Sequence, residues 1–359
     1  MLHTPLMERG GGERQILRLA FGLQKLGHEV EVFTNGVNPE RCYPEILKYL
    51  KVNVVSHPFP PFRSRRSSFD KKVEKTSSDK TLIRRILGAQ FYSYLFPMML
   101  DLGRRIPKGF DIINNHNFPT EWAAFIAKKN LKVPVVWMCN EPPFWFWHSE
   151  QREGFSKINW PLFEIFDKIA VEYIDEIIVL SHVAESLVKT IYNRLSKVVR
   201  SGVDIELFHN ASGKEVRKKH GLENDFVLLH VGNISTYKRQ FDSVKALYYL
   251  SKNYDNVKLI LDGAGSREEL IKLGEKFGVR HKILFLHSVS DEELAKVYAA
   301  CDVFVFPSQI TWGLVVAEAM AAAKPVVVSR RAGSSEIIQS GVNGIVIDHA
   351  KPEKIAKQV

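Results

Sequence analysis

One segment of the chain places a carboxylate near the start of a predicted helix that follows a buried strand. Val303–Phe306 is a continuous apolar run typical of a buried strand, and a helical pattern begins near Leu314. A helix start presents unpaired N–H groups and the positive end of the helix dipole, and both attract phosphate. Glu318 can accept hydrogen bonds from two neighbouring hydroxyls, as a ribose presents them. The segment therefore predicts a site for a ligand rich in hydroxyls and phosphates.

Two further loops in the second half follow predicted strands and contain glycine. One runs from Gly232 and Asn233 to the cations Lys238 and Arg239. Lysine offers phosphate a point charge and arginine a forked contact, although exposed surface cations would leave the same pattern. The other loop contains Gly263, which lets the backbone approach a ligand closely, although the aspartate before it could simply cap a helix. Both loops fit a phosphate-binding site.

The first half of the chain carries its own candidate residues. Gly10, Gly11 and Gly12 precede a helical pattern and can bring the backbone close to a ligand, but their spacing is not that of the dinucleotide fingerprint. His116 and Asn140 each follow a predicted strand, where they can line the same cleft, and a histidine there can donate to a sugar hydroxyl or a phosphate oxygen. A tight turn and a structural histidine remain the alternatives.

The elements that must position these residues alternate between strand and helix. This βαβ rhythm predicts an α/β fold with parallel sheets, and it restarts at residue 226, so we expect two doubly wound domains, residues 1–203 and 204–359. Ligands bind such sheets at the carboxyl ends of the strands, so two facing domains make a cleft.

Met1–Arg9 does not have the pattern of a buried strand, and the chain stops inside a helical pattern. We therefore expect that the first strand is missing and that the second domain is truncated. The predicted strands are residues 28–34, 52–55, 111–113, 133–137, 176–180, 197–199, 226–231, 257–261, 283–286, 303–306 and 325–328.

The composition is ordinary for a globular protein, with 45% hydrophobic and 25% charged residues among 359. The formal net charge of +10 is unusual and favours an anionic partner, unless it only keeps the surface soluble. No nucleic-acid recognition motif is present, so we expect no nucleic-acid partner. Three widely spaced cysteines and the lack of a recognisable leader predict a cytoplasmic protein.

One basic and then apolar segment, residues 61–100, breaks the βαβ rhythm. Its cations followed by an aromatic, apolar stretch suit an anionic bilayer surface, and we predict peripheral membrane contact there, on the inner face of the membrane. The alternative is a solvated loop before a core helix. The aromatic run Phe144–Trp147 is likewise assigned to the core or to membrane contact.

These motifs, in this order, resemble the family 4 (group 1) glycosyltransferases of the GT-B fold, over nearly the whole chain. The first half is similar to the family at Gly11–Arg14, at Asp111–His116 and at the hinge Ser201–Phe208. The second half is similar to it at the loops already described and also at 289–294, 301–308 and 333–344. The resemblance implies two Rossmann-like domains facing a cleft, with the acceptor side in 1–203 and the nucleotide sugar in 204–359.

The resemblance also implies an activity. It indicates a retaining, hexosyltransferase-type enzyme that moves a sugar from a UDP- or GDP-sugar, for instance GDP-mannose, to a lipid-linked or other glycan acceptor, without a cofactor or a metal. The catalytic residues that it implies are His116, Lys238 and Glu318. It assigns the acceptor or phosphate loop to Gly10, Gly11, Gly12 and Asn140. The donor-binding residues that it implies are Gly232, Asn233, Lys238, Arg239, Gly263, Val289, Gln309, Gly313, Leu314, Val315 and Glu318.

Two residues depart from the pattern of the family. Asn233 replaces the arginine that follows the loop glycine, and Ile310 replaces the first of two glutamates that are separated by seven residues. Gln309 could serve instead if the loop shifts by one residue, but it would supply no negative charge. The alternatives are therefore a catalytically weak or inactive nucleotide-sugar-binding member of a membrane glycan-assembly complex and, less well matched, a nucleotide-sugar epimerase.

Overall fold

The computed structural model describes residues 1–55, 96–142, 156–287, 289–348 and 351–359, with backbone alone for 156–162. The chain forms two compact units, Met1–Val199 and Arg200–Val359, whereas the sequence places the domain boundary at 203/204. Most of the predicted membrane segment and the aromatic run Phe144–Trp147 lie outside the described residues. Residues 96–100 of that segment lie in a helix, and Met98 and Met99 are buried in the core.

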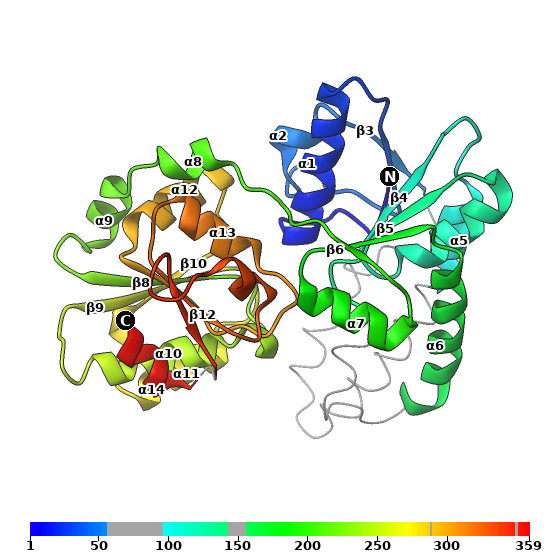
Figure 1. Ribbon diagram of the computed structural model, residues 1–359. Helices are drawn as coiled ribbons and strands as arrows, with labels where there is room; N and C mark the ends of the chain where they lie inside the picture. The colour runs from blue at the N-terminus through cyan, green and yellow to red at the C-terminus, as the bar shows by residue number, and fades with distance from the viewer. Residues whose placement is uncertain (56–95, 143–155, 288, 349–350) are drawn as a thin grey trace, which may run out of the picture. The chain divides into compact units, whose positions relative to one another are not determined.

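The first unit is built on a parallel sheet of seven strands in the order β3-β2-β1-β4-β5-β6-β7 (Figure 1). Its strands are β1 Leu2–His3, β2 Glu31–Thr34, β3 Lys51–Val54, β4 Ile113–His116, β5 Val135–Met138, β6 Glu176–Val179 and β7 Lys197–Val198. Its helices are α1 Gly11–Lys25, α2 Pro44–Leu47, α5 Thr120–Leu131, α6 Ser156–Glu172 and α7 His182–Tyr192. All carboxyl ends of a parallel sheet lie along one edge, so the loops after β1, β4 and β5 are neighbours.

The expectation that the first strand is missing was wrong. β1 lies between β2 and β4, with Leu2 paired to Phe33 on one side and to Asn115 on the other. Leu2 and His3 are each 1% exposed. A strand of two residues, one of them polar, is too short for the apolar run that signals a buried strand.

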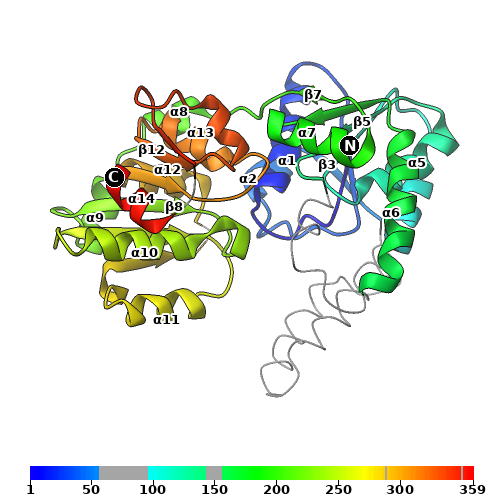
Figure 2. The same ribbon diagram turned by 60° about the horizontal axis from the view of Figure 1, so that its bottom comes forward.

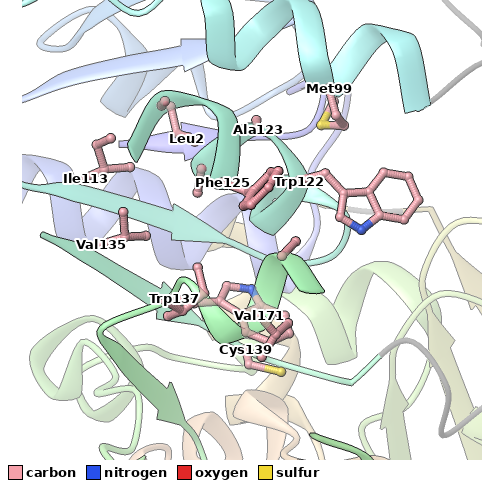
Figure 3. Close-up of a cluster of buried hydrophobic side chains, with 14 of the residues drawn as sticks. Leu2, Met99, Ile113, Trp122, Ala123, Phe125, Val135, Trp137, Cys139 and Val171 are labelled. Carbon is pink, nitrogen blue, oxygen red and sulfur yellow. The ribbon is translucent and has the colours of Figure 1, made fainter. Parts of the chain in front are cut away.

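The core of the first unit packs aromatic and aliphatic side chains between the sheet and its helices (Figure 3). Trp122 of α5 and Trp137 of β5 are fully buried in it. The indole Nε1–H of Trp122 donates to Asp167 Oδ1 at 2.8 Å, so a carboxylate of α6 is held inside this core.

The second unit is a parallel sheet of six strands in the order β10-β9-β8-β11-β12-β13. Its strands are β8 Phe226–Val231, β9 Val257–Asp262, β10 Ile283–Leu286, β11 Val303–Phe306, β12 Val326–Ser329 and β13 Ile345–Ile347. Its α-helices are α8 Ile205–His209, α9 Lys214–His220, α10 Gln240–Leu250, α11 Glu268–Lys276, α12 Asp291–Ala300, α13 Leu314–Ala321 and α14 Pro352–Gln358, and its 3-10 helices are η1 Thr236–Lys238, η2 Arg280–Lys282 and η3 Gly333–Ile337.

Helices cover both faces of this second sheet (Figure 2). One apolar cluster joins the sheet to α8, α9, α12 and α13, and a second cluster joins it to α10, α11 and α14. The strands themselves read as continuous apolar runs because both of their faces are buried. No described helix is both long enough and apolar enough to cross a membrane.

Candidate functional site

The two loops that were predicted to bind a nucleotide sugar are joined to each other at the carboxyl edge of the second sheet. The backbone N–H of Gln309 donates to the carbonyl of Tyr237 at 2.9 Å. The hydroxyl of Ser308 donates to the carbonyl of Lys238 at 2.9 Å. The loop after β8 and the loop after β11 therefore form one surface, as the pairing of β8 with β11 requires.

Two glycines in this edge are required by close approach and by their backbone angles. Gly263 has φ +148°, and a Cβ on it would lie 2.2 Å from the carbonyl oxygen of Gly232. Gly313, which precedes α13, has φ +134°, and a Cβ there would lie 2.7 Å from the ring of Phe306. Both angles lie in the region that only glycine adopts readily. Glycine at these two positions lets the Gly232 backbone and the ring of Phe306 pack closely at the strand ends and at the start of α13.

Lys238 supplies a positive charge beside the end of β11. Its Nζ lies 5.7 Å from the ring centroid of Phe306 and 5.5 Å from that of Tyr237. His230, near the end of β8, is buried and pairs through Nδ1 with Ser243 Oγ at 2.8 Å. Burial, with a smaller contribution from Lys238, lowers the pKa of His230 to about 3. The imidazole is therefore neutral at pH 7 and leaves Lys238 as the cation at this point of the edge.

Glu318 lies in α13 and is 1% exposed. The hydroxyl of Tyr298 in α12 lies 2.9 Å from Glu318 Oε2 and 3.1 Å from the carbonyl oxygen of Val315. A side chain from the neighbouring helix thus fixes the carboxylate that was predicted to bind a ribose. This partner was not predicted, because residues 298 and 318 lie on different helices.

Ile310 occupies the position where the resemblance implies a glutamate, and the backbone holds it there. Its carbonyl accepts from the N–H of Gly333 at 2.9 Å, and it forms a β-bridge with Ala332. Its side chain packs against the core of the second unit. Gln309 is also held through its backbone, by the bond of its N–H to Tyr237, and its role in place of the glutamate stays a prediction.

The remaining predicted donor residues lie at this same edge in different roles. Asn233 Oδ1 accepts from the N–H of Ala264 at 3.1 Å, so this side chain joins the loop after β8 to the loop after β9. Arg239 has a left-handed backbone, with φ +61°, and forms an ion pair of 2.5 Å with Asp242. Val289 packs against the core. The phosphate role predicted for Arg239 stays a prediction, with Asp242 as a competing partner.

The glycine loop of the first unit forms the start of α1, with Gly10 as its N-cap residue. The hydroxyl of Tyr43 donates to the Gly10 carbonyl at 3.1 Å. Arg9 lies 4.7 Å from the Tyr43 ring centroid and makes a two-pronged contact with Glu45, at 3.0 and 2.9 Å. This cluster fixes the conformation of the loop from the side of α2.

His116, at the end of β4, is completely buried. Asn114 donates through Nδ2 to the carbonyl of Val136 at 2.9 Å, so its Oδ1 is the acceptor for His116 Nε2 at 2.8 Å. The proton therefore lies on Nε2, and Nδ1 is an acceptor without a hydrogen-bond partner among the described residues. Burial, with smaller effects of His3 and the Met1 amino group, holds the pKa of His116 well below its usual range, so it is a neutral base.

Asn140, which follows β5, contacts Asn117 after β4, and Asn117 in turn contacts His3 of β1. Asn140 Nδ2 donates to Asn117 Oδ1 at 2.6 Å, and Asn117 Nδ2 lies 3.0 Å from His3 Nε2. The structure thus places His116, Asn140 and the glycine loop at one edge of the first sheet. His3 and Asn117 were not singled out from the sequence.

The two parts of the chain match two family descriptions. Residues 9–207 match "Glycosyltransferase Family 4", and residues 212–359 match "Glycosyl transferases group 1". The chain belongs to the family 4, or group 1, glycosyltransferases.

Curated relatives of this glycosyltransferase carry the same general name. An uncharacterized glycosyltransferase of Methanocaldococcus jannaschii is 29% identical over 94% of this chain and 81% of that protein. D-inositol 3-phosphate glycosyltransferase of Mycolicibacterium smegmatis is 25% identical over 97% of this chain and 78% of that protein. The family and these relatives make the chain an enzyme of the hexosyltransferase type.

Solved structures show the same fold for the glycosyltransferase. Anabaena HepE in complex with UDP and glucose aligns with a TM-score of 0.73 at 20% identity, over 99% of this chain and 87% of that one. WaaG, a glycosyltransferase involved in lipopolysaccharide biosynthesis, aligns with a TM-score of 0.70 at 18% identity, over 99% of this chain and 88% of that one. The fold is therefore GT-B, as the resemblance implies.

Within the described part of the glycosyltransferase, no three His, Cys, Asp or Glu side chains are grouped so that they could hold a metal ion. The expectation that the enzyme needs neither metal nor cofactor stays a prediction. The positive charge for a phosphate would then come from Lys238 and from helix starts such as that of α13.

Proposed function

We propose that this glycosyltransferase moves a sugar from a nucleoside-diphosphate sugar to a hydroxyl of a lipid-linked or other glycan, with retention of configuration. The observation that carries the proposal is the joined pair of loops at the carboxyl edge of the second sheet. They bring Lys238 and the start of α13 to one edge, and Glu318 lies in that helix. A nucleoside diphosphate needs these three features: a cation, helix N–H groups and an acceptor for ribose hydroxyls.

The donor side follows from the chemistry of these groups. Lys238 and the N–H groups at the start of α13 neutralise the diphosphate as it leaves, and Glu318, oriented by Tyr298, accepts from the ribose. The anomeric carbon forms a bond with the acceptor oxygen and breaks its bond with the diphosphate oxygen on the same face of the sugar. The hydroxyl proton of the acceptor passes to the departing diphosphate, so no protein nucleophile is required. HepE was solved with UDP-glucose, and UDP-glucose is accordingly the first donor to try.

The acceptor side is assigned to the first unit. The glycine loop at the start of α1, with Asn140 and the neutral His116, offers donors and acceptors suited to hydroxyls and to a phosphate. A net charge of +10 favours an anionic acceptor or an anionic membrane surface. We therefore place the enzyme in the cytoplasm or on the inner face of a membrane, with an acidic glycan lipid as the preferred acceptor.

The decisive experiment measures sugar transfer with and without the buried carboxylate. A panel of UDP- and GDP-sugars is incubated with extracted lipid acceptors, and products are detected by mass. Glu318→Ala removes hydrogen bonds of a charged group, each worth about 1.5–3 kcal/mol, so we expect the donor KM to rise at least about tenfold. Glu268→Ala is the matched control, because Glu268 pairs with Lys272 on an exposed helix face. Transfer that is equal in both variants would contradict the donor site, and no transfer by the unaltered enzyme with any donor would overturn the proposed activity.

A second candidate is a catalytically weak member that binds the nucleotide sugar within a membrane glycan complex. The fixed position of Ile310 favours it, since an isoleucine cannot stabilise charge near the reacting carbon. Ile310→Glu tests it in the same assay. A gain of transfer only in this variant would support the second candidate, whereas full activity of the unaltered chain and a loss in Ile310→Glu would exclude it.

A further inference from the structure

A chain of hydrogen bonds crosses the carboxyl edge of the first sheet. Asn140 Nδ2 donates to Asn117 Oδ1 at 2.6 Å, Asn117 Nδ2 lies 3.0 Å from His3 Nε2, and His3 Nδ1 lies 2.8 Å from the carbonyl oxygen of Thr4. The chain joins the ends of β1, β4 and β5. We call these three side chains, His3, Asn117 and Asn140, the amide relay.

The direction of the amide relay is set by its last acceptor. A carbonyl oxygen can only accept, so the proton of His3 lies on Nδ1, and Nε2 of a neutral imidazole then accepts from Asn117 Nδ2. With Nδ2 used in this way, Asn117 Oδ1 accepts from Asn140. In the reversed arrangement both amides are turned over, so that His3 Nε2 donates to Asn117 Oδ1 and Asn117 Nδ2 donates to Asn140 Oδ1. His3 then carries a proton on Nε2 in addition to the one on Nδ1, and is therefore charged. The protonation state of one buried histidine therefore decides how two amides are oriented.

Asn117 also contacts the glycine loop. A Cβ on Gly12 would lie 2.4 Å from Asn117 Nδ2, so this amide lies directly against the start of α1. The backbone of Asn117 is left-handed, with φ +61°, and its N–H donates to the carbonyl of Met138 at 3.1 Å. Asparagine tolerates this conformation better than most residues, but the strain is a cost that the surrounding bonds must offset.

We propose that His3 and Asn117 are positioning residues for sugar transfer: neutral His3, acting through Asn117, orients the Asn140 amide and holds the glycine loop for the acceptor. This inference rests on the proposed function, because it assigns Asn140 and the glycine loop to acceptor binding. It adds two residues that act through the Asn140 amide and the glycine loop, and it makes acceptor binding dependent on the charge of a histidine.

The charged and titratable groups that face His3 come from the two elements packed against it. Glu13 of α1 and the carbonyl of Thr4 favour the charged imidazole, and neutral His116 of β4 is the other titratable group near it. Burial is the largest effect and lowers the pKa of His3 below its usual value near 6.5. His3 is therefore neutral at pH 7, and acid reverses the amide relay as His3 takes up a proton.

The discriminating variant is Asn117→Asp, which keeps the shape of the side chain and exchanges the donor for an acceptor. A carboxylate oxygen then faces the lone pair of neutral His3, and the bond returns only when His3 is protonated. We expect the pKa of His3 to rise by about 1–3 units, as for a charge pair at contact distance. Long-range imidazole NMR of the ¹⁵N-histidine-labelled full chain measures this pKa and shows which nitrogen carries the proton, with His3→Gln to assign the signal.

The kinetic measurement separates positioning from mere stability. With UDP-glucose or another active donor, the unaltered enzyme should lose acceptor kcat/KM as pH falls, whereas Asn117→Asp should lose it at high pH and recover as pH falls. The donor KM should stay within about twofold in both, since the donor loops lie in the other unit. Asn256→Asp is the matched control, because Asn256 donates to the Asn224 carbonyl on an exposed turn of the second unit.

The outcomes distinguish this inference from the proposed function. A proton on His3 Nε2 in the unaltered enzyme at pH 7, or the same pH profile for Asn117→Asp and the control, would overturn the inference while leaving transfer intact. If the unaltered enzyme transfers no sugar, the proposed function is wrong. The NMR measurement then decides on its own whether neutral His3 orients the relay.

Discussion

At the scale of single residues, two positions at the carboxyl edge of the second sheet lack the charged side chains that the family resemblance implies, and the residues there hold the loops in place instead. Asn233 stands where an arginine is expected, and its amide joins two loops through Ala264. Ile310 stands where a glutamate is expected, and its backbone bonds hold the loop against η3. Both exchanges keep the loops in place while they remove groups that would interact with the phosphates or the reacting carbon. Under the proposed function, we therefore expect Lys238 and Glu318 to carry a larger share of donor binding.

Tyr298 tests this dependence on Glu318. Tyr298→Phe deletes the hydroxyl that lies 2.9 Å from the buried carboxylate and keeps the ring in the core. A hydrogen bond to a charged group contributes about 1.5–3 kcal/mol, so we expect the donor KM to rise about tenfold or more, with a smaller change in acceptor KM. Steady-state kinetics with both substrates varied measures the two constants. An unchanged donor KM, equal to that of Tyr254→Phe on an exposed tyrosine, would show that Tyr298 does not position the carboxylate.

At the scale of elements, the sequence predicts what depends on local pattern and not what depends on contacts. The strands at β8, β9 and β11 are apolar runs of adequate length, and the glycine loops after them could be located because loops at strand ends bind ligands in this class of fold. β1 was missed because two residues carry too little pattern. His3 was missed with it, since a residue in no predicted strand could not be placed at a sheet edge.

The partners of the site residues required the three-dimensional structure for the same reason. The bond between Asn140 and Asn117 joins two strand ends, and that between Asn117 and His3 spans 114 residues of sequence. Such contacts depend on the strand order, in which β1 lies next to β4 although β2 and β3 intervene along the chain. The identity of the loops was therefore predictable, while the side chains that orient them were not.

At the scale of the whole molecule, each unit presents one edge of polar groups over a core that covers both faces of its sheet. The core of the first unit encloses two carboxyl groups that interact with each other. Glu121 and Asp167 are both fully buried. Burial raises the pKa of Asp167, whereas the hydrogen bonds that it accepts from Trp122 Nε1 at 2.8 Å and from the Tyr192 hydroxyl at 2.7 Å oppose this rise and favour its charged form. Burial and the neighbouring Asp167 raise the pKa of Glu121 well above its usual range, so Glu121 is the protonated member of the pair.

This carboxyl pair predicts how the stability of the first unit depends on pH. In the unfolded chain the carboxyl group of Glu121 loses its proton at about pH 4.3, the usual value for this type of side chain, whereas in the folded protein it keeps the proton to a higher pH. The free energy of unfolding therefore falls as pH rises from about 4.3 through the folded pKa. Glu121→Gln is neutral at every pH and loses this dependence, at about 1.4 kcal/mol for each unit of pKa shift. Urea unfolding, followed by tryptophan fluorescence, is measured at several pH values between about 5 and 9. As pH rises, the free energy of unfolding of the variant should increase relative to that of the unaltered chain. The exposed change Glu268→Gln is the control, and parallel curves for Glu121→Gln and the unaltered chain would mean that Glu121 is already ionised in the folded protein.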